Sequence, residues 1–220
     1  SDFDYVKESP TDSAAAATAL STGYKTRNGM LAFLPDGTIL PHIMNDAEAL
    51  GKATGVLSSV YFSHATPAGF IAHNQSRSNY QEIANEMIWE SEADLIMGPG
   101  HPWYDDDGKK VGGIEPNLFD TPLTYDRVGG EVSWKNLLDG KPAADADGDG
   151  TPDAWNVITS REGIQQLAEV ENPGRVLGVV PVHSTLQANR SGDVNANPFV
   201  VPLNETSPTM KEMIAASLNV

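Results

Sequence analysis

The residue best placed for chemistry is a serine at the start of a predicted helix. Ser13 follows Asp12 and precedes four alanines, Ala14–Ala17, in a stretch that Gly23 closes. Free backbone N–H groups and the helix dipole at such an N-terminus favour an anion, and they lower the cost of forming a serine alkoxide beside a metal ion. A plain Ser N-cap is the commoner explanation of this pattern, so the residues alone leave both interpretations open.

A second group of candidate residues lies about 50 positions further along the chain. His64 and Thr66 belong to a His-Ala-Thr-Pro-Ala segment, and Arg77 follows it. A planar guanidinium can bind two oxygens of a tetrahedral anion in a way that Lys cannot reproduce. Each residue by itself is more often structural, because a His after a strand and an Arg at a helix entry are common.

The two segments together resemble the alkaline phosphatase family. Residues 12–18, Asp-Ser-Ala-Ala-Ala-Ala-Thr, resemble the active-site motif, and residues 64–68 with Arg77 resemble a second motif of that family. The resemblance implies that Ser13 is phosphorylated and then dephosphorylated by water. It also implies that Asp12 helps to orient Arg77, which clamps the substrate phosphate.

The resemblance further implies two zinc ions and one magnesium ion in the intact enzyme. Thr66 would ligate the magnesium, and His64 would lie near that ion without binding it directly. The family's zinc-ligand motifs, both upstream and downstream, do not occur in this sequence, whose abrupt ends suggest a fragment. We therefore expect residues 1–220 alone to have little or no phosphatase activity.

An acidic segment at residues 145–153 offers a different chemistry. Carboxylates at every second position, with Gly at the turn, are typical of a loop that wraps oxygen ligands around calcium. The backbone carbonyl of Thr151 would add a ligand, whereas Asn156 stands where an EF-hand has its bidentate Glu. Calcium binding and a solvated acidic turn are both open. The carboxylates concerned are Asp145, Asp147, Asp149 and Asp153.

Alternating apolar segments and helices predict the scaffold that holds these residues. We expect an α/β/α sandwich around a mostly parallel sheet, forming part of a single domain over residues 1–220. Residues 103–154 are polar and rich in turns, so they are predicted to be an excursion from the sheet, with a hairpin at Asp105–Gly108. His101 is expected to be a loop residue and not a metal ligand. The expected strands are 54–62, 94–97 and 176–182. The expected helices are one that starts near 13, one at 79–90, one that starts at a capping box with Thr159 as N-cap and Glu162 at N3, and one that Ser207-Pro208 opens with Ser207 as its cap.

Composition narrows the functional classes. The chain has a formal net charge of −16 and no cysteine, and it contains no apolar run long enough to cross a membrane. The strong negative charge argues against nucleic acid or an anionic membrane as a partner. The absence of cysteine excludes thiol chemistry. The resemblance implies small phosphate monoesters as substrates, a homodimer, and a periplasmic or extracellular location. The alternatives are a calcium-binding extracellular module and another metallo-esterase of the same superfamily.

Overall fold

Four parallel strands form one sheet in the computed structural model, which describes residues 4–111 and 122–220. The order across the sheet is β1, β2, β4, β3, and every neighbouring pair is parallel. The strands are β1 (Gly55–Leu57), β2 (Leu95–Gly98), β3 (Asn156–Ile158) and β4 (Val176–Val179). The expected mostly parallel sheet is confirmed.

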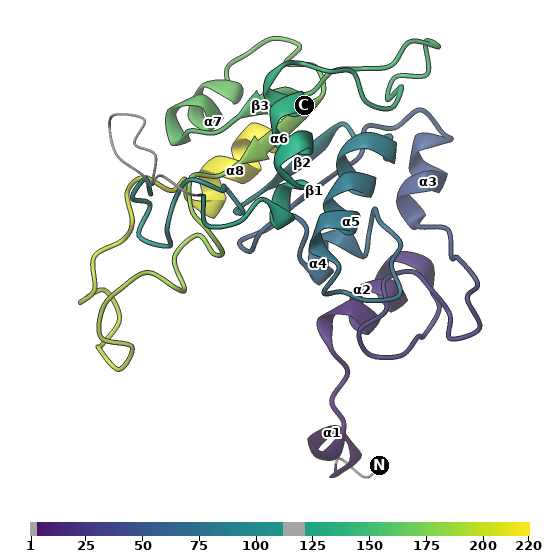
Figure 1. The fold of residues 1–220 in the computed structure, drawn as a ribbon, viewed down its shortest axis with the longest axis horizontal. Coiled ribbons are helices and arrows are strands. Elements are labelled where there is room, and N and C mark those ends of the chain that lie inside the picture. The colour runs from purple at the N-terminus through teal and green to yellow at the C-terminus, as the bar shows by residue number, and fades with distance from the viewer. Residues whose placement is uncertain (1–3, 112–121) are drawn as a thin grey trace.

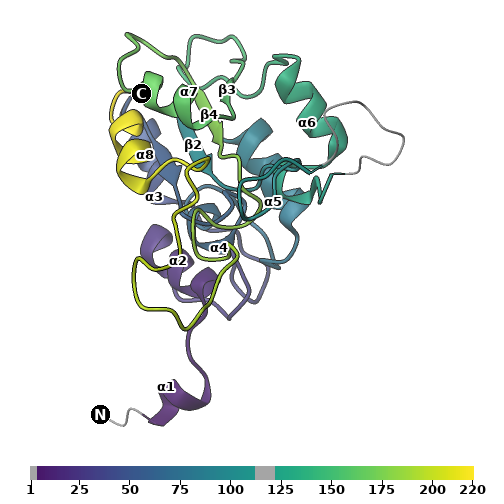
Figure 2. The ribbon, with the colours of Figure 1, turned by 90° about the vertical axis from the view of Figure 1, so that its left-hand side faces the viewer.

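Helices cover both faces of this sheet, as the alternation of side chains along β2 and β4 requires. Ile96 and Leu177 point into a core formed with helix α5 (Tyr80–Asn85), the π-helical turn η1 (Glu86–Glu90) and α6 (Glu131–Leu138). On the opposite face, Met97 and Val176 pack against α7 (Arg161–Leu167) and α8 (Met210–Ser217). Figure 1 gives the order of the elements, and Figure 2 shows these two helical layers on either side of the strands. The predicted α/β/α sandwich is therefore confirmed.

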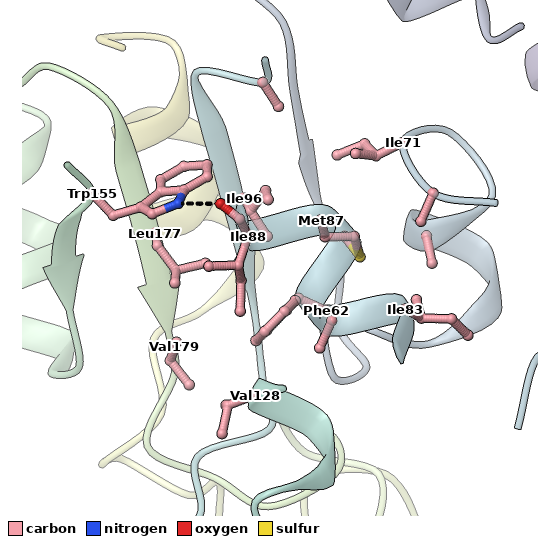
Figure 3. Close-up of a cluster of buried hydrophobic side chains, with 14 of the residues drawn as sticks. Phe62, Ile71, Ile83, Met87, Ile88, Ile96, Val128, Trp155, Leu177 and Val179 are labelled. Carbon is pink, nitrogen blue, oxygen red and sulfur yellow. Dashed lines mark hydrogen bonds between the residues drawn. The ribbon is translucent and has the colours of Figure 1, made fainter. Parts of the chain in front are cut away.

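The larger core joins the sheet to the helix predicted at 79–90. That helix forms as α5, and its last residues widen into η1. Side chains satisfy carbonyls of this turn, because Trp155 Nε1 donates to the carbonyl oxygen of Ile88 over 2.8 Å (Figure 3) and Ser91 Oγ donates to that of Met87 over 2.6 Å. The indole of Trp155 thereby connects the segment before β3 to the helical layer.

Several predicted boundaries are wrong in detail. The strand expected at 54–62 is confined to β1, since the chain turns away towards helix α4 (Ala65–Ala68), and β4 ends at Val179. The sequence pattern missed β3 and the helix α6, which interrupts the excursion at 103–154. The hairpin at Asp105–Gly108 is confirmed by an antiparallel bridge between Tyr104 and Lys110. The remaining helices are α1 (Asp4–Glu8), α2 (Ser13–Thr22), α3 (Ile43–Glu48) and the 3₁₀ turn η2 (Asp126–Val128).

Two helix caps also differ from the prediction. Ser160, not Thr159, caps α7 by accepting from the backbone N–H of Gly163 over 3.0 Å. Thr209, not Ser207, caps α8 in a capping box with Glu212. In both cases a neighbouring hydroxyl residue competes for the same role, and propensity alone does not separate them. None of the helices in the described ranges has the length and hydrophobicity needed to cross a membrane.

We predict that Glu212 makes the fold sensitive to acid. Hydrogen bonds from Arg161, outweighing partial burial, lower the pKa of Glu212 from 4.5 to about 2. Because the folded-state pKa is depressed, the ionised Glu212 carboxylate stabilises the fold above about pH 4.5, and this stabilisation is lost as the pH falls towards 2. Glu212→Gln should therefore reduce the free energy of unfolding at neutral pH and flatten its fall over this range, as measured by urea unfolding.

Glu169→Gln is the matched control, because this exposed carboxylate follows α7 and its side chain accepts no hydrogen bond from the residues that the structure describes. If the free energy of unfolding of Glu212→Gln fell with pH as steeply as that of the wild type, the role of Glu212 in acid sensitivity would be contradicted.

Candidate active site

Helix α2 begins with Asp12 as its N-cap and Ser13 as its first residue. Asp12 has extended backbone angles, and its Oδ1 accepts from the N–H of Ala15 over 2.9 Å. The plain interpretation of Ser13 as the cap is therefore wrong, since Asp12 fills that position. Ser13 is half-buried, and its hydroxyl makes no hydrogen bond to any residue in the described ranges. A free hydroxyl at a helix N-terminus is the arrangement that a nucleophile needs.

The carboxylate of Asp12 holds Arg77 beside this helix start. Arg77 Nη1 lies 3.1 Å from Asp12 Oδ2, and the same oxygen accepts from the backbone N–H of Gly29 over 2.9 Å. The backbone N–H of Arg77 in turn donates to the carbonyl of Gly29 over 2.7 Å. Partial burial alone would raise the pKa of Asp12, but hydrogen bonds from Ala15, Arg77 and Gly29 outweigh it and lower the pKa. Asp12 is thus ionised and joins the cap, the loop and the guanidinium.

His64 binds the other end of the same guanidinium. Its Nε2 lies 3.2 Å from Arg77 Nη2. Because arginine only donates, Nε2 must carry the lone pair, and the imidazole proton belongs on Nδ1. That Nδ1 is buried and has no hydrogen-bond partner in the described part of the chain. Burial, reinforced by the charges of Arg77 and Arg127, lowers the pKa of His64, which favours this neutral form.

Thr66 reaches the same region through the short helix α4, which packs against α2. The two helices approach closely at Gly69, where an added Cβ would lie 2.7 Å from the Cβ of Ala17. Ser21 Oγ in α2 also donates to the carbonyl of Gly69 over 2.5 Å. Thr66 is exposed, and no residue in the described ranges hydrogen-bonds to its hydroxyl. Its oxygen is therefore free to act as a ligand.

The carboxyl edge of the sheet places three loops in this neighbourhood. The segments after β1, β2 and β4 contain His64, His101 and His183 in turn. Ligands of open α/β sheets bind at this edge, so the topology is consistent with an active site here. His101 does not belong to it as a ligand, because it is buried edge-on against Tyr104 and Trp134, and its Nδ1 accepts from Trp103 N–H over 3.1 Å. Burial, followed by the charge of Lys110, lowers the pKa of His101 to about 4.

Sequence patterns missed a cluster that surrounds His64. The ring of Tyr61 packs edge-on against His64 with a centroid separation of 4.9 Å, and Arg127 lies 4.3 Å from the centroid of Tyr61. Tyr80 packs edge-on against Tyr61 at 5.2 Å. Arg127 stands in the turn-rich excursion, where no periodicity identifies it. Tyr61 lies in the apolar run that predicts a strand at 54–62, and that pattern gives it no role in a site.

The described residues do not supply a zinc site beside Ser13. Within them, one group of three His, Cys, Asp or Glu side chains has ligand atoms close enough for an ion, namely Asp145, Asp147 and Asp149, whose atoms lie within 4.8 Å of one another. Next to Ser13 in the chain, the Asp12 carboxylate is engaged by Ala15, Gly29 and Arg77. Thr66 has an exposed hydroxyl without a hydrogen-bond partner in the described ranges, and a hydroxyl oxygen is the kind of donor that suits magnesium.

The acidic loop gathers three of its four predicted carboxylates. Asp145 accepts from the N–H groups of Gly148 and Gly150, each over 2.8 Å, which bends the loop around its own carboxylate. Asp153 is not a member of the three-residue group, and its Oδ2 accepts from the N–H of Ala146 over 2.8 Å. Asp153 therefore closes the base of the loop.

Comparison with known proteins agrees with this geometry. The alkaline phosphatase family model matches residues 4–220. Alkaline phosphatase of Escherichia coli (strain K12) is 48% identical over 115 residues, which cover 44% of this chain and 24% of that protein. Alkaline phosphatase 4 of Bacillus subtilis (strain 168) is 37% identical over 99 residues, which cover 43% of this chain and 22% of that protein.

A solved structure gives a match over nearly the whole chain. A cold-active alkaline phosphatase from the psychrophile Shewanella sp. superposes with a TM-score of 0.60 and 28% identity, covering 96% of this chain and 39% of that one. The chain thus spans about a quarter of the curated relatives that it matches and under half of this structural neighbour. Its fold, its motifs at Ser13 and Arg77, and the family match over residues 4–220 agree, and the chain belongs to the alkaline phosphatase family.

Proposed function

We propose that this chain carries the nucleophile and the phosphate clamp of an enzyme that hydrolyses phosphate monoesters through a phosphoserine intermediate. The observation that supports this most directly is the Asp12 carboxylate, which caps α2 directly before Ser13 and holds the guanidinium of Arg77 3.1 Å away. A nucleophile, an anion-favouring helix end and a bidentate cation thereby share one location.

The reaction needs two displacements at phosphorus. In the first, Ser13 Oγ forms a bond to phosphorus as the bond to the ester oxygen breaks, and the substrate alcohol leaves with one proton. In the second, water attacks the phosphoserine, the Oγ–P bond breaks, and inorganic phosphate and the serine hydroxyl are regenerated. Splitting the hydrolysis in this way replaces one difficult step by two easier ones.

Arg77 would orient the phosphate throughout both displacements. A guanidinium has five N–H groups, of which Asp12 and His64 engage one on each terminal nitrogen. The remaining N–H groups are available to two phosphate oxygens. Because Asp12 and His64 fix the plane of the guanidinium from both ends, little side-chain freedom remains to be lost on binding.

Metal ions enter the proposal through residues inside and outside this chain. We propose that Thr66 ligates magnesium, with His64 nearby. When bound, the metals would polarise the reacting oxygens and stabilise charge on the phosphoryl group. Since the described residues hold no zinc site next to Ser13, zinc-dependent turnover is not assigned to residues 1–220 alone. Small phosphate monoesters as substrates, a homodimer and a periplasmic or extracellular location are further proposals that follow the family.

A second candidate function is calcium binding at the loop of Asp145, Asp147 and Asp149. The three carboxylates offer ligand atoms within 4.8 Å of one another, which is what favours this role. It is compatible with the enzymatic proposal, because the loop precedes β3 and its hydrogen bonds within the described residues involve neither Ser13 nor Arg77.

We expect Ser13→Ala in the whole protein to abolish the phosphoenzyme and to reduce kcat by roughly 10³-fold or more, because the attacking oxygen is removed. Acid-quenched protein incubated with ³²P-labelled substrate would report the intermediate. Ser78→Ala, next to Arg77 on the exposed surface, is the control and should retain wild-type labelling. Labelling of Ser13→Ala at the wild-type level would exclude the role. Parallel assays with a phosphodiester and a sulfate ester distinguish the related metallo-esterases.

Arg77→Lys should weaken inorganic phosphate binding by about tenfold or more, since an ammonium keeps the charge but loses the fork. The measurement is the competitive inhibition constant of phosphate. Arg161→Lys provides a matched control, because Arg161 also makes a two-nitrogen contact with a carboxylate, that of Glu212, in the opposite helical layer. Equal inhibition constants for Arg77→Lys and the wild type would rule out the clamp.

For the acidic loop, millimolar calcium should raise the Tm of the wild-type protein, and Asp147→Asn should remove most of that rise because a ligand charge is lost. Asp139→Asn, an exposed carboxylate outside the loop, should leave the calcium response intact. A calcium-independent Tm in the wild type would identify the loop as a solvated turn.

A further inference from the structure

The surroundings of Arg127 are unusual for an arginine in so acidic a chain. It is half-buried, and no carboxylate in the described ranges lies within ion-pair distance of it, although the formal net charge is −16. Its Nη1 instead donates to the carbonyl of His183 over 2.6 Å, and its guanidinium carbon lies 4.3 Å from the centroid of the Tyr61 ring. The aromatic face is therefore a principal partner of this cation.

Tyr61 connects that cation to the phosphate clamp. The backbone of Tyr61 is fixed on both sides. Its N–H donates to the carbonyl of Ser184 over 3.1 Å, and its carbonyl accepts from the N–H of His64 over 2.9 Å. The imidazole of His64 packs edge-on against the ring, with an interplanar angle of 83°. The ring of Tyr61 thus contacts both Arg127 and His64.

The ring of His64 has few other restraints. Its Nδ1 is buried without a partner, and its Nε2 bonds only to Arg77 among the residues that the structure describes. Rotation of the imidazole would break the acceptor contact with Arg77 Nη2 and leave the guanidinium fixed at one end only, by Asp12. The edge-on contact with the Tyr61 ring restrains this rotation.

We infer that Tyr61 and Arg127 are positioning residues for substrate binding: Arg127 anchors the ring of Tyr61, the ring fixes His64, and His64 fixes Arg77 for the phosphate. This inference rests on the proposed function of Arg77 as the clamp. It assigns Tyr61 and Arg127 no contact with the reacting atoms.

The test uses the whole protein and reads phosphate binding separately from turnover. Tyr61→Leu and Arg127→Met should each raise the dissociation constant of inorganic phosphate by about fivefold to tenfold, measured by calorimetry in a Ser13→Ala background. With Ser13 present, the KM for p-nitrophenyl phosphate should rise more than kcat falls. Tyr61→Phe keeps the ring and should restore wild-type values. Trp103→Leu, which removes an aromatic packed against Tyr125 and not against His64, should change neither constant.

A double-mutant cycle tests the route through His64. In a His64→Ala background, Tyr61→Leu should weaken phosphate binding by less than twofold, because the group that it positions is gone. The inference is overturned if Tyr61→Phe weakens binding as much as Tyr61→Leu, if Tyr61→Leu has no effect, or if its effect persists without His64.

The two proposals fail in distinguishable ways. A phosphoenzyme that persists in Ser13→Ala refutes the proposed nucleophile and leaves the phosphate-binding comparison intact. A wild-type protein that binds no phosphate refutes both. Thermal unfolding of each variant separates misfolding from a positional effect, and an Arg127→Met protein that folds normally and binds phosphate like the wild type also overturns the inference.

Discussion

The carboxylate of Asp12 is the interaction on which the arrangement of this site depends. One oxygen closes the first turn of α2, and the other accepts from both Gly29 and Arg77. A single ionised side chain therefore fixes where the helix starts, where the following loop returns, and where the guanidinium lies. A half-buried charge requires compensation of this kind, and here it comes from two backbone N–H groups and the guanidinium of Arg77.

The rest of the fold serves to bring distant segments to that carboxylate. The parallel sheet delivers the loops after β1, β2 and β4 to one edge, and two apolar layers hold the strands in register. Helix α4 follows β1 in the chain and lies against α2, so the His64 segment meets the Ser13 segment through helix packing. Local structure at each segment is simple, whereas their meeting is a property of the whole sheet.

Sequence alone predicted those parts of the molecule whose signals are local. The helix after Ser13, its end at Gly23, and the buried strands predicted at 94–97 and 176–182, which form at 95–98 and 176–179, follow from small-residue, glycine and apolar patterns. Strand β3 was missed because Asn156–Ile158 is only three residues long and half-exposed. The residues Asp12, Ser13, His64 and Arg77 were identified by family resemblance, and their contacts with one another required the structure. Tyr61 and Arg127 had no such signal, since aromatic–cation contacts between positions 66 residues apart leave no periodic trace.

The close approach at Gly69 has a consequence for how this chain can vary. With only 2.7 Å between an added Cβ and the methyl group of Ala17, any side chain at position 69 would push α4 away from α2. Such a shift would carry His64 and Thr66 with it and separate them from Ser13 and Arg77. A substitution without any polar or charged character could thus abolish function as completely as the loss of a catalytic group. The side chains tolerated at positions 17 and 69 are therefore coupled, because the contact between α2 and α4 has no room for a larger group at position 69 while Ala17 is present.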